Sequence, residues 1–207
     1  MILPQPPLLV VTDRRQAKRP LDAILDEAFA AGCRWASIRE KYLRPAEQVI
    51  LLRNLLPLAR NYRATLTLHG DPTLALEAGA HGVHLAAGSD AKAARALLGR
   101  AALIGISIHS LTDAAVLDPE ILDYAIAGPI FETMSKPGYG PGLGVKGLRV
   151  IRDESRVPIV AIGGITSGSI VDIRRSGVDG IAVMGGLMRA DDVGGQMEEL
   201  LAALCGV

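Results

Sequence analysis

Aromatic residues are scarce in this chain, and neither sign of charge is in excess. Only 3% of the 207 residues are aromatic, and 22 basic side chains balance 22 acidic ones. Proteins that stack nucleobases need aromatic surfaces, and proteins that bind a duplex or an anionic membrane need a basic one. The composition therefore argues against nucleic acid and membrane partners, and any charge that binds phosphate has to be local.

Cysteines and long apolar runs are also lacking. The two cysteines, Cys33 and Cys205, form neither a metal-binding spacing nor a disulfide framework, so we expect reduced thiols in a cytoplasmic protein. No stretch approaches the roughly 20 apolar residues of a transmembrane helix. Residues 1–7 lack the basic and then apolar segments of a signal peptide. Whether the chain forms a homo-oligomer stays open.

Strand-like and helix-like segments alternate along the whole chain. The expected strands are 8–12, 35–39, 65–69, 82–85, 103–107, 124–127, 158–162 and 180–184. The expected helices are 20–31, 45–60, 72–78, 91–98, 111–117, 145–153, 167–176 and 191–204. Eight such units in about 200 residues predict an α/β fold, a single-domain (β/α)8 TIM barrel over residues 1–207. A doubly wound open sheet is the alternative.

Two strands near the C-terminus run directly into paired glycines. The first leads into Gly163 and Gly164, and the second ends in Met184 before Gly185 and Gly186. Glycine lets a ligand approach the backbone and leaves amide N–H groups for an anion. Since (β/α)8 barrels often bind phosphate after their last two strands, these glycines predict a site for a small phosphorylated molecule.

Two cations lie at the end of the expected second strand. Arg39 and Lys41 are two residues apart, so their side chains point to the same face of the strand end. Active sites of such barrels lie at these strand ends. The pair is suited to a diphosphate, with arginine binding through its forked guanidinium and lysine as a point charge. The alternative is a structural ion pair with Glu40 or Asp13.

Two aspartates follow the third and fourth expected strands. Asp71 and Asp90 are placed to share Mg²⁺, which takes few carboxylates and keeps water or substrate phosphates. Each also precedes an expected helix, where a carboxylate caps the first turn. Both are the candidate metal ligands, although helix capping is the favoured interpretation of either residue taken alone.

Three histidines and one lysine lie near the other strand ends. His69 is the candidate acid or base that faces substrate. The apolar run around His84 is typical of a core histidine with satisfied ring nitrogens, and His109 lies in a polar turn where it can orient backbone. Lys136 lies in the glycine-rich segment 131–144, either as part of a lid over a bound anion or as a solvated loop lysine.

Six motifs occur in a recognisable order. They are Arg-Glu-Lys at 39–41, Gly-Val-His-Leu at 82–85, Gly-Ile-Ser-x-His at 105–109, Gly-Pro-Ile-Phe-x-Thr-x-Ser-Lys at 128–136, Ala-Ile-Gly-Gly-Ile at 161–165 and Gly-x-Asp-Gly-Ile-Ala-Val-Met at 177–184. With them the chain resembles the thiamine phosphate synthase/TenI family over nearly its whole length. The resemblance implies a (β/α)8 barrel that joins a pyrimidine diphosphate to a thiazole phosphate and releases pyrophosphate with Mg²⁺.

The resemblance also implies roles for residues of this chain. Arg39 and Lys41 match the diphosphate-binding pair, and Ser107 and Lys136 match pyrophosphate contacts. Thr133 and Ser135 fall near the thiazole. The glycines that follow the last two expected strands match the positions whose amides bind the thiazole phosphate, and Met184 lies beside them. These glycines are Gly163, Gly164, Gly185 and Gly186.

Some positions depart from the family pattern. Ser37 stands where the synthases have Gln, and the metal-ligand positions fall on Gly70 and on Ser89, beside Asp90. Pro129 occupies the position of the catalytic histidine of TenI-like thiazole tautomerases, for which His69 would be a relocated base. Three readings follow: a synthase first, then a tautomerase, then a non-catalytic thiazole-phosphate binder or regulator.

Overall fold

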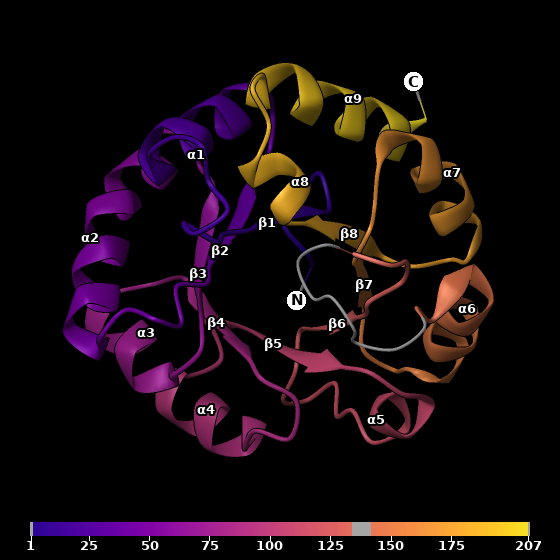
Figure 1. Ribbon diagram of the computed structural model, residues 1–207. Helices are drawn as coiled ribbons and strands as arrows, with labels where there is room; N and C mark the ends of the chain where they lie inside the picture. The colour runs from indigo at the N-terminus through magenta and orange to yellow at the C-terminus, as the bar shows by residue number, and fades with distance from the viewer. Residues whose placement is uncertain (1, 134–141, 207) are drawn as a thin grey trace.

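Eight parallel strands close into a barrel in the computed structural model, which describes residues 2–133 and 142–206 (Figure 1). The strands are β1 (Leu8–Val11), β2 (Trp35–Ile38), β3 (Thr65–His69), β4 (Gly82–Leu85), β5 (Leu103–Ile108), β6 (Tyr124–Ala127), β7 (Ile159–Ile162) and β8 (Gly180–Val183). Each strand pairs with the next, and β8 pairs with β1. The predicted (β/α)8 barrel is confirmed, and closure of the sheet rules out the open alternative.

Helices surround the barrel. They are α1 (Leu21–Ala30), α2 (Pro45–Asn61), α3 (Pro72–Ala78), α4 (Ala91–Leu98), α5 (Leu111–Ala115), α6 (Gly144–Glu154), α7 (Ser167–Arg175), α8 (Gly185–Met188) and α9 (Val193–Cys205). The expectation of eight helices was wrong, because α8 is a ninth within the described ranges and begins directly at Gly185. Glycine has a poor helix propensity, and the pair at 185–186 therefore concealed this short helix.

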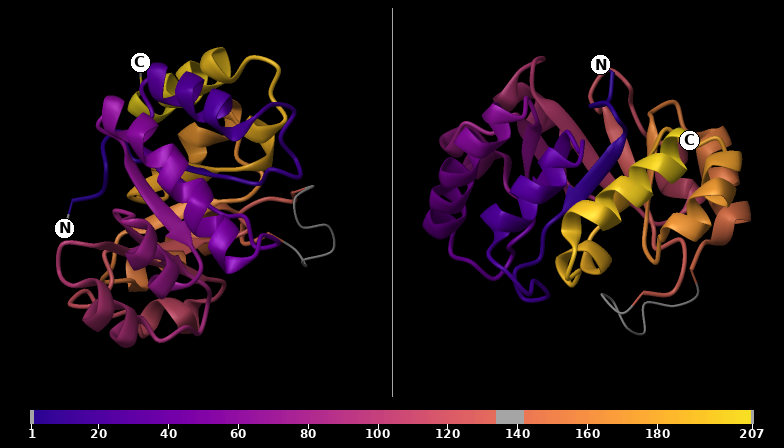
Figure 2. Two further views of the ribbon diagram at one scale, coloured as in Figure 1. Left: turned by 90° about the vertical axis from the view of Figure 1, so that its left-hand side faces the viewer. Right: turned by 90° about the horizontal axis from the view of Figure 1, so that it is seen from above.

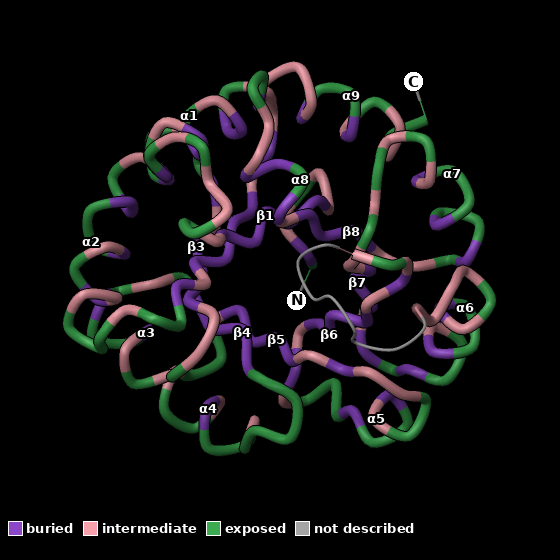
Figure 3. Tube along the Cα trace, in the orientation of Figure 1, coloured by how far each residue is buried: buried purple, intermediate pink, exposed green. Residues whose placement is uncertain are grey.

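Alternate residues of each strand face opposite sides, which gives the barrel two separate apolar layers. The interior cluster includes Leu9, Trp35, Tyr124 and Val160, whereas the residues between them pack against the helices. Figure 3 shows the strands and the inward helix faces buried and the outward helix faces exposed. Because both strand faces are buried, the strands read as continuous apolar runs.

The two ends of the barrel differ. The parallel register places residues such as His69 and His84 side by side, and all eight strands end at the same mouth. The N-terminal segment lies at the opposite end (Figure 2), where Leu3 joins the interior cluster. In the described parts of the chain, no helix has the length and apolarity needed to cross a bilayer.

Candidate active site

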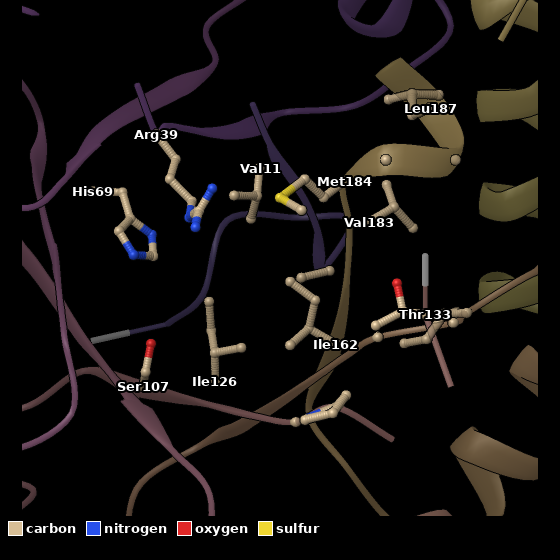
Figure 4. A pocket seen from close by; sticks show the side chains of 18 of the residues that line it. Val11, Arg39, His69, Ser107, Ile126, Thr133, Ile162, Val183, Met184 and Leu187 are labelled. Atoms are coloured by element: carbon tan, nitrogen blue, oxygen red, sulfur yellow. The ribbon is translucent and has the colours of Figure 1, made fainter. Parts of the chain in front are cut away.

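A pocket of about 450 Å³ opens at the mouth where the strands end (Figure 4). Residues at or just beyond the ends of all eight strands line it, from Val11 at the end of β1 to Met184 after β8. This is the end at which (β/α)8 barrels carry their active sites.

The side of the pocket formed by β2 to β5 is polar. Arg39, Lys41, His69 and Ser107 all line it, so the structure brings together four of the predicted site residues. In Figure 4 the guanidinium of Arg39, the ring of His69 and the hydroxyl of Ser107 point into the same space. Two cations and a hydroxyl around one space make this side suited to an anion.

Glu40 lies between the two cations in the sequence, and its carboxylate binds residues that follow β1. It is 1% exposed, and its carboxylate accepts hydrogen bonds from the Thr12 hydroxyl at 2.7 Å and the Arg14 N–H at 3.1 Å. The Arg39 N–H donates in turn to the Thr12 hydroxyl at 2.9 Å. Glu40 therefore fastens the end of β1 to the end of β2. Among the ion pairs of the described residues, none joins Arg39 to Glu40 or Asp13.

The opposite side of the pocket contains the glycines after β7. Gly163 and Gly164 have φ values of 107° and 64°, a region that glycine adopts readily. A Cβ at Gly163 would lie 2.7 Å from the Pro129 Cβ, and one at Gly164 would lie 2.6 Å from the Glu132 carbonyl oxygen. Glycine is required here because the chain after β6 packs directly against it, a reason that the sequence did not reveal.

The glycines after β8 complete this side. Met184, Gly185 and Gly186 line the pocket at the start of α8. Two residues that the sequence reasoning missed lie beside them. Arg189 follows α8 and lines the pocket, and Gln196 of α9 places its Nε2 3.7 Å from where a Cβ of Gly186 would lie. Their only sequence signal is closeness to the glycine pair.

Apolar side chains separate the two sides. In Figure 4, Val11, Ile126 and Ile162 lie between the polar side chains of Arg39, His69 and Ser107 and the opposite side with Val183 and Thr133. A ligand that spans the pocket would therefore place apolar or weakly polar atoms in the middle and anionic groups at the ends.

His84 lies below the polar side, fully buried between two hydroxyl groups. Its Nε2 is 2.9 Å from Ser107 Oγ and its Nδ1 is 3.2 Å from the Tyr124 hydroxyl. Burial, and next the charge of Lys41, lowers the pKa of His84 to about 3. The ring is therefore neutral near pH 7, and the prediction of a core histidine with satisfied nitrogens is confirmed.

The remaining candidates fall in different places. His109 Nδ1 lies 2.7 Å from the Gly128 carbonyl oxygen, which confirms that it orients backbone. Thr133 lines the pocket. Ser135 and Lys136 lie outside the described residues.

Asp71 and Asp90 both cap helices. Asp71 accepts a hydrogen bond from the Thr73 N–H at 2.7 Å, and Asp90 accepts one from the Ala93 N–H at 2.9 Å. Neither is among the described residues that line the pocket. Within 2–133 and 142–206, no group of three or more His, Cys, Asp or Glu could hold a metal ion. Both carboxylates cap helices outside the lining of the pocket, so the structure does not show them as Mg²⁺ ligands, and that role stays a prediction.

Fold and pocket together define an α/β barrel whose mouth offers a cationic side and a glycine-lined side. Comparisons with known proteins show to which family of α/β barrels the chain belongs. The family model described as thiamine monophosphate synthase matches residues 8–187. The chain is 36% identical over 199 residues to the thiamine-phosphate synthase of Chloroflexus aurantiacus. This alignment covers 94% of this chain and 91% of the relative.

A solved structure agrees. Thiamine phosphate pyrophosphorylase from Pyrococcus furiosus superposes with a TM-score of 0.85 at 32% identity, over 96% of this chain and 95% of that one. The chain belongs to the thiamine monophosphate synthase family, as its motifs indicated.

Proposed function

We propose that this chain is a thiamine-phosphate synthase, which couples a pyrimidine diphosphate to a thiazole phosphate. The observation that carries the proposal is the division of one pocket into a cationic side, an apolar middle and a glycine-lined side. Two relatives that align over 95% and 94% of the chain are named putative thiamine-phosphate synthase and thiamine-phosphate synthase. A reaction between two small anionic substrates requires such a division, because the two phosphate ends have to be held apart while the rings meet.

The polar side would hold the diphosphate. Arg39 binds it through two N–H groups and Lys41 through its ammonium. As the bond between the pyrimidine methylene carbon and the diphosphate oxygen breaks, the electron pair leaves with the oxygen. Fixed cations stabilise the charge that develops there, and they do so more strongly in the transition state than before it.

The glycine side would hold the thiazole phosphate on its amide N–H groups. The thiazole nitrogen then lies across the apolar middle from the cationic side. Its lone pair forms the new C–N bond to the methylene carbon, and no proton has to move. The products are thiamine phosphate and pyrophosphate.

None of these steps is routed through Mg²⁺, because its predicted ligands Asp71 and Asp90 cap helices outside the lining of the pocket. We also propose that the protein acts in the cytoplasm. The thiol of Cys33 is free and buried, and cysteines stay reduced in that compartment.

The proposal is tested by mixing the protein with both substrates and measuring thiamine phosphate by chromatography. Equal amounts of thiamine phosphate and pyrophosphate are expected, with at least a tenfold lower rate for Arg39→Ala. The control is Arg53→Ala, which alters an exposed arginine of α2. Folded protein that forms no product in the presence or absence of Mg²⁺ contradicts the proposal. Accelerated proton exchange on the thiazole, without coupling, would favour the tautomerase instead.

A further inference from the structure

A line of hydrogen-bonded side chains runs from the polar side of the pocket into the barrel interior. It starts at Ser107 on β5, passes through the ring of His84 on β4 and reaches the hydroxyl of Tyr124 on β6. Only Ser107 and His84 of this line touch the pocket. The motifs assigned Ser107 to the diphosphate but gave His84 and Tyr124 no role in the reaction.

Tyr124 is held in one position. Its ring packs edge-on against Trp35 at 4.7 Å between centroids and an interplanar angle of 79°. It occupies the space that Gly105 leaves open, since a Cβ at Gly105 would lie 2.1 Å from the Tyr124 ring. Burial raises the pKa of Tyr124, while a hydrogen bond with Thr67 acts in the opposite direction. The hydroxyl therefore keeps its proton.

A neutral imidazole has one N–H, which donates, and one bare nitrogen, which accepts. One of the two flanking hydroxyls therefore accepts a hydrogen bond from the ring, and the other donates one to it. Both tautomers of His84 fit the two distances, and the proposal below adopts the one in which Tyr124 donates its proton to Nδ1 and the Nε2–H of His84 donates to Ser107. The oxygen of Ser107 is then occupied as an acceptor, and its own proton is directed to another partner. That partner would be a ligand in the pocket, because the Ser107 hydroxyl points into the space that the guanidinium of Arg39 also faces (Figure 4).

We propose that His84 and Tyr124 are positioning residues, which orient the Ser107 hydroxyl as a hydrogen-bond donor to the departing diphosphate. The proposal rests on the function proposed above. His84 does not exchange a proton with substrate, because both of its nitrogens are occupied and it stays neutral. It acts through Ser107 alone.

Two substitutions separate the contacts of His84. Glutamine places an amide near the position of Nε2 and keeps the bond to Ser107, whereas the shorter asparagine reaches only toward Tyr124. Pyrophosphate affinity, measured by calorimetry without turnover, should fall about tenfold in Ser107→Ala and His84→Asn, as expected for loss of a hydrogen bond to a charged group. His84→Gln should stay within about threefold of the original protein. Tyr124→Phe should lose less than His84→Asn, because the imidazole stays.

A double-mutant cycle decides between positioning and mere packing. If His84 acts through Ser107, then His84→Asn has no further effect on pyrophosphate affinity in the Ser107→Ala background. The effect on the synthase reaction should fall on kcat rather than KM, because charge on the leaving oxygen grows in the transition state. Tyr124→Phe supplies the same cycle if His84→Asn does not fold, as judged by urea denaturation.

The outcomes are distinct. Additive losses in the cycle, or equal losses in His84→Gln and His84→Asn, overturn the positioning role even when the original protein is an active synthase. Original protein that forms no thiamine phosphate instead contradicts the proposed function, whatever the variants do.

Discussion

The Cβ that any other residue would carry at Gly163 would lie 2.7 Å from the Cβ of Pro129 and 2.8 Å from its Cα. This contact joins the end of β7 to the chain after β6, and it fixes the wall of the pocket that the glycines form. The two segments are also tied by the Phe131 N–H, which donates to the Gly163 carbonyl oxygen at 3.1 Å. The geometry of the proposed phosphate site therefore depends on a glycine that packing requires.

Gly163→Ala should destabilise the protein by about 2 kcal/mol or more, because a strained φ of 107° is combined with a steric clash against backbone. Urea denaturation measures this. Gly168→Ala is the matched control, since Gly168 lies in α7, a Cβ there would meet nothing within 4 Å, and alanine favours the helix. Equal stability of the two variants would contradict the close packing of the chain after β6 against Gly163.

Arg39→Ala and Lys41→Ala should each weaken pyrophosphate binding by about tenfold or more, since each removes a charged donor from the polar side of the pocket. Arg39→Lys should restore only part of the affinity, because an ammonium lacks the guanidinium's paired donors. Calorimetry at two salt concentrations measures both effects. Unchanged affinity in Arg39→Ala would place the diphosphate elsewhere.

Acid should destabilise the protein through His84. Its pKa is about 3 in the folded chain, against an ordinary value of 6.5, so the unfolded chain binds the extra proton first as the pH falls. The stability is complete above about pH 6.5 and declines between there and about pH 3, by up to about 1.4 kcal/mol per pH unit. Lys41, the His69 ring at 4.7 Å and the Tyr124 hydroxyl face this group.

The comparison is the urea midpoint at pH 7 and pH 5 for the original protein and His84→Gln. We expect a steeper fall in the original protein, because glutamine does not titrate. Parallel slopes would show that His84 is not the group responsible.

Asp71→Ala and Asp90→Ala should each cost about 1 kcal/mol of stability through loss of a helix cap. Asp71→Asn and Asp90→Asn retain a capping oxygen and should stay near the original stability. Measuring the rate against Mg²⁺ concentration in the asparagine variants separates the two roles. A shifted Mg²⁺ dependence in a stable variant would establish a ligand, and an unchanged one would leave only the caps.

The barrel could be predicted because its signals are local and repeated. Val/Ile runs such as 159–162 end in glycines, and Asp71 before Pro72 marks a helix start. The strands β3, β4 and β6 have the predicted bounds. The helix α8 was missed because its stability depends on packing of Leu187 and Met188, both fully buried, rather than on propensity.

The site could be predicted only in part. Arg39, Lys41, His69 and Ser107 lie at or just beyond the ends of strands, and parallel topology brings all strand ends together. In contrast, the Ser107–His84–Tyr124 line joins β5, β4 and β6, and no spacing along the chain indicates which interior side chains meet. The roles of Gln196 and Arg189 in lining the pocket likewise depend on where α8 and α9 fold over the mouth.

A crystal structure with pyrophosphate and thiazole phosphate bound together tests the central claim most directly. We predict pyrophosphate against Arg39, Lys41 and Ser107, and the thiazole phosphate on the amides of Gly164 and Gly185, with its ring over Ile126 and Ile162. Both ligands on the same side of the pocket, or a thiazole phosphate away from the glycines, would contradict the division of the pocket on which the proposed reaction depends.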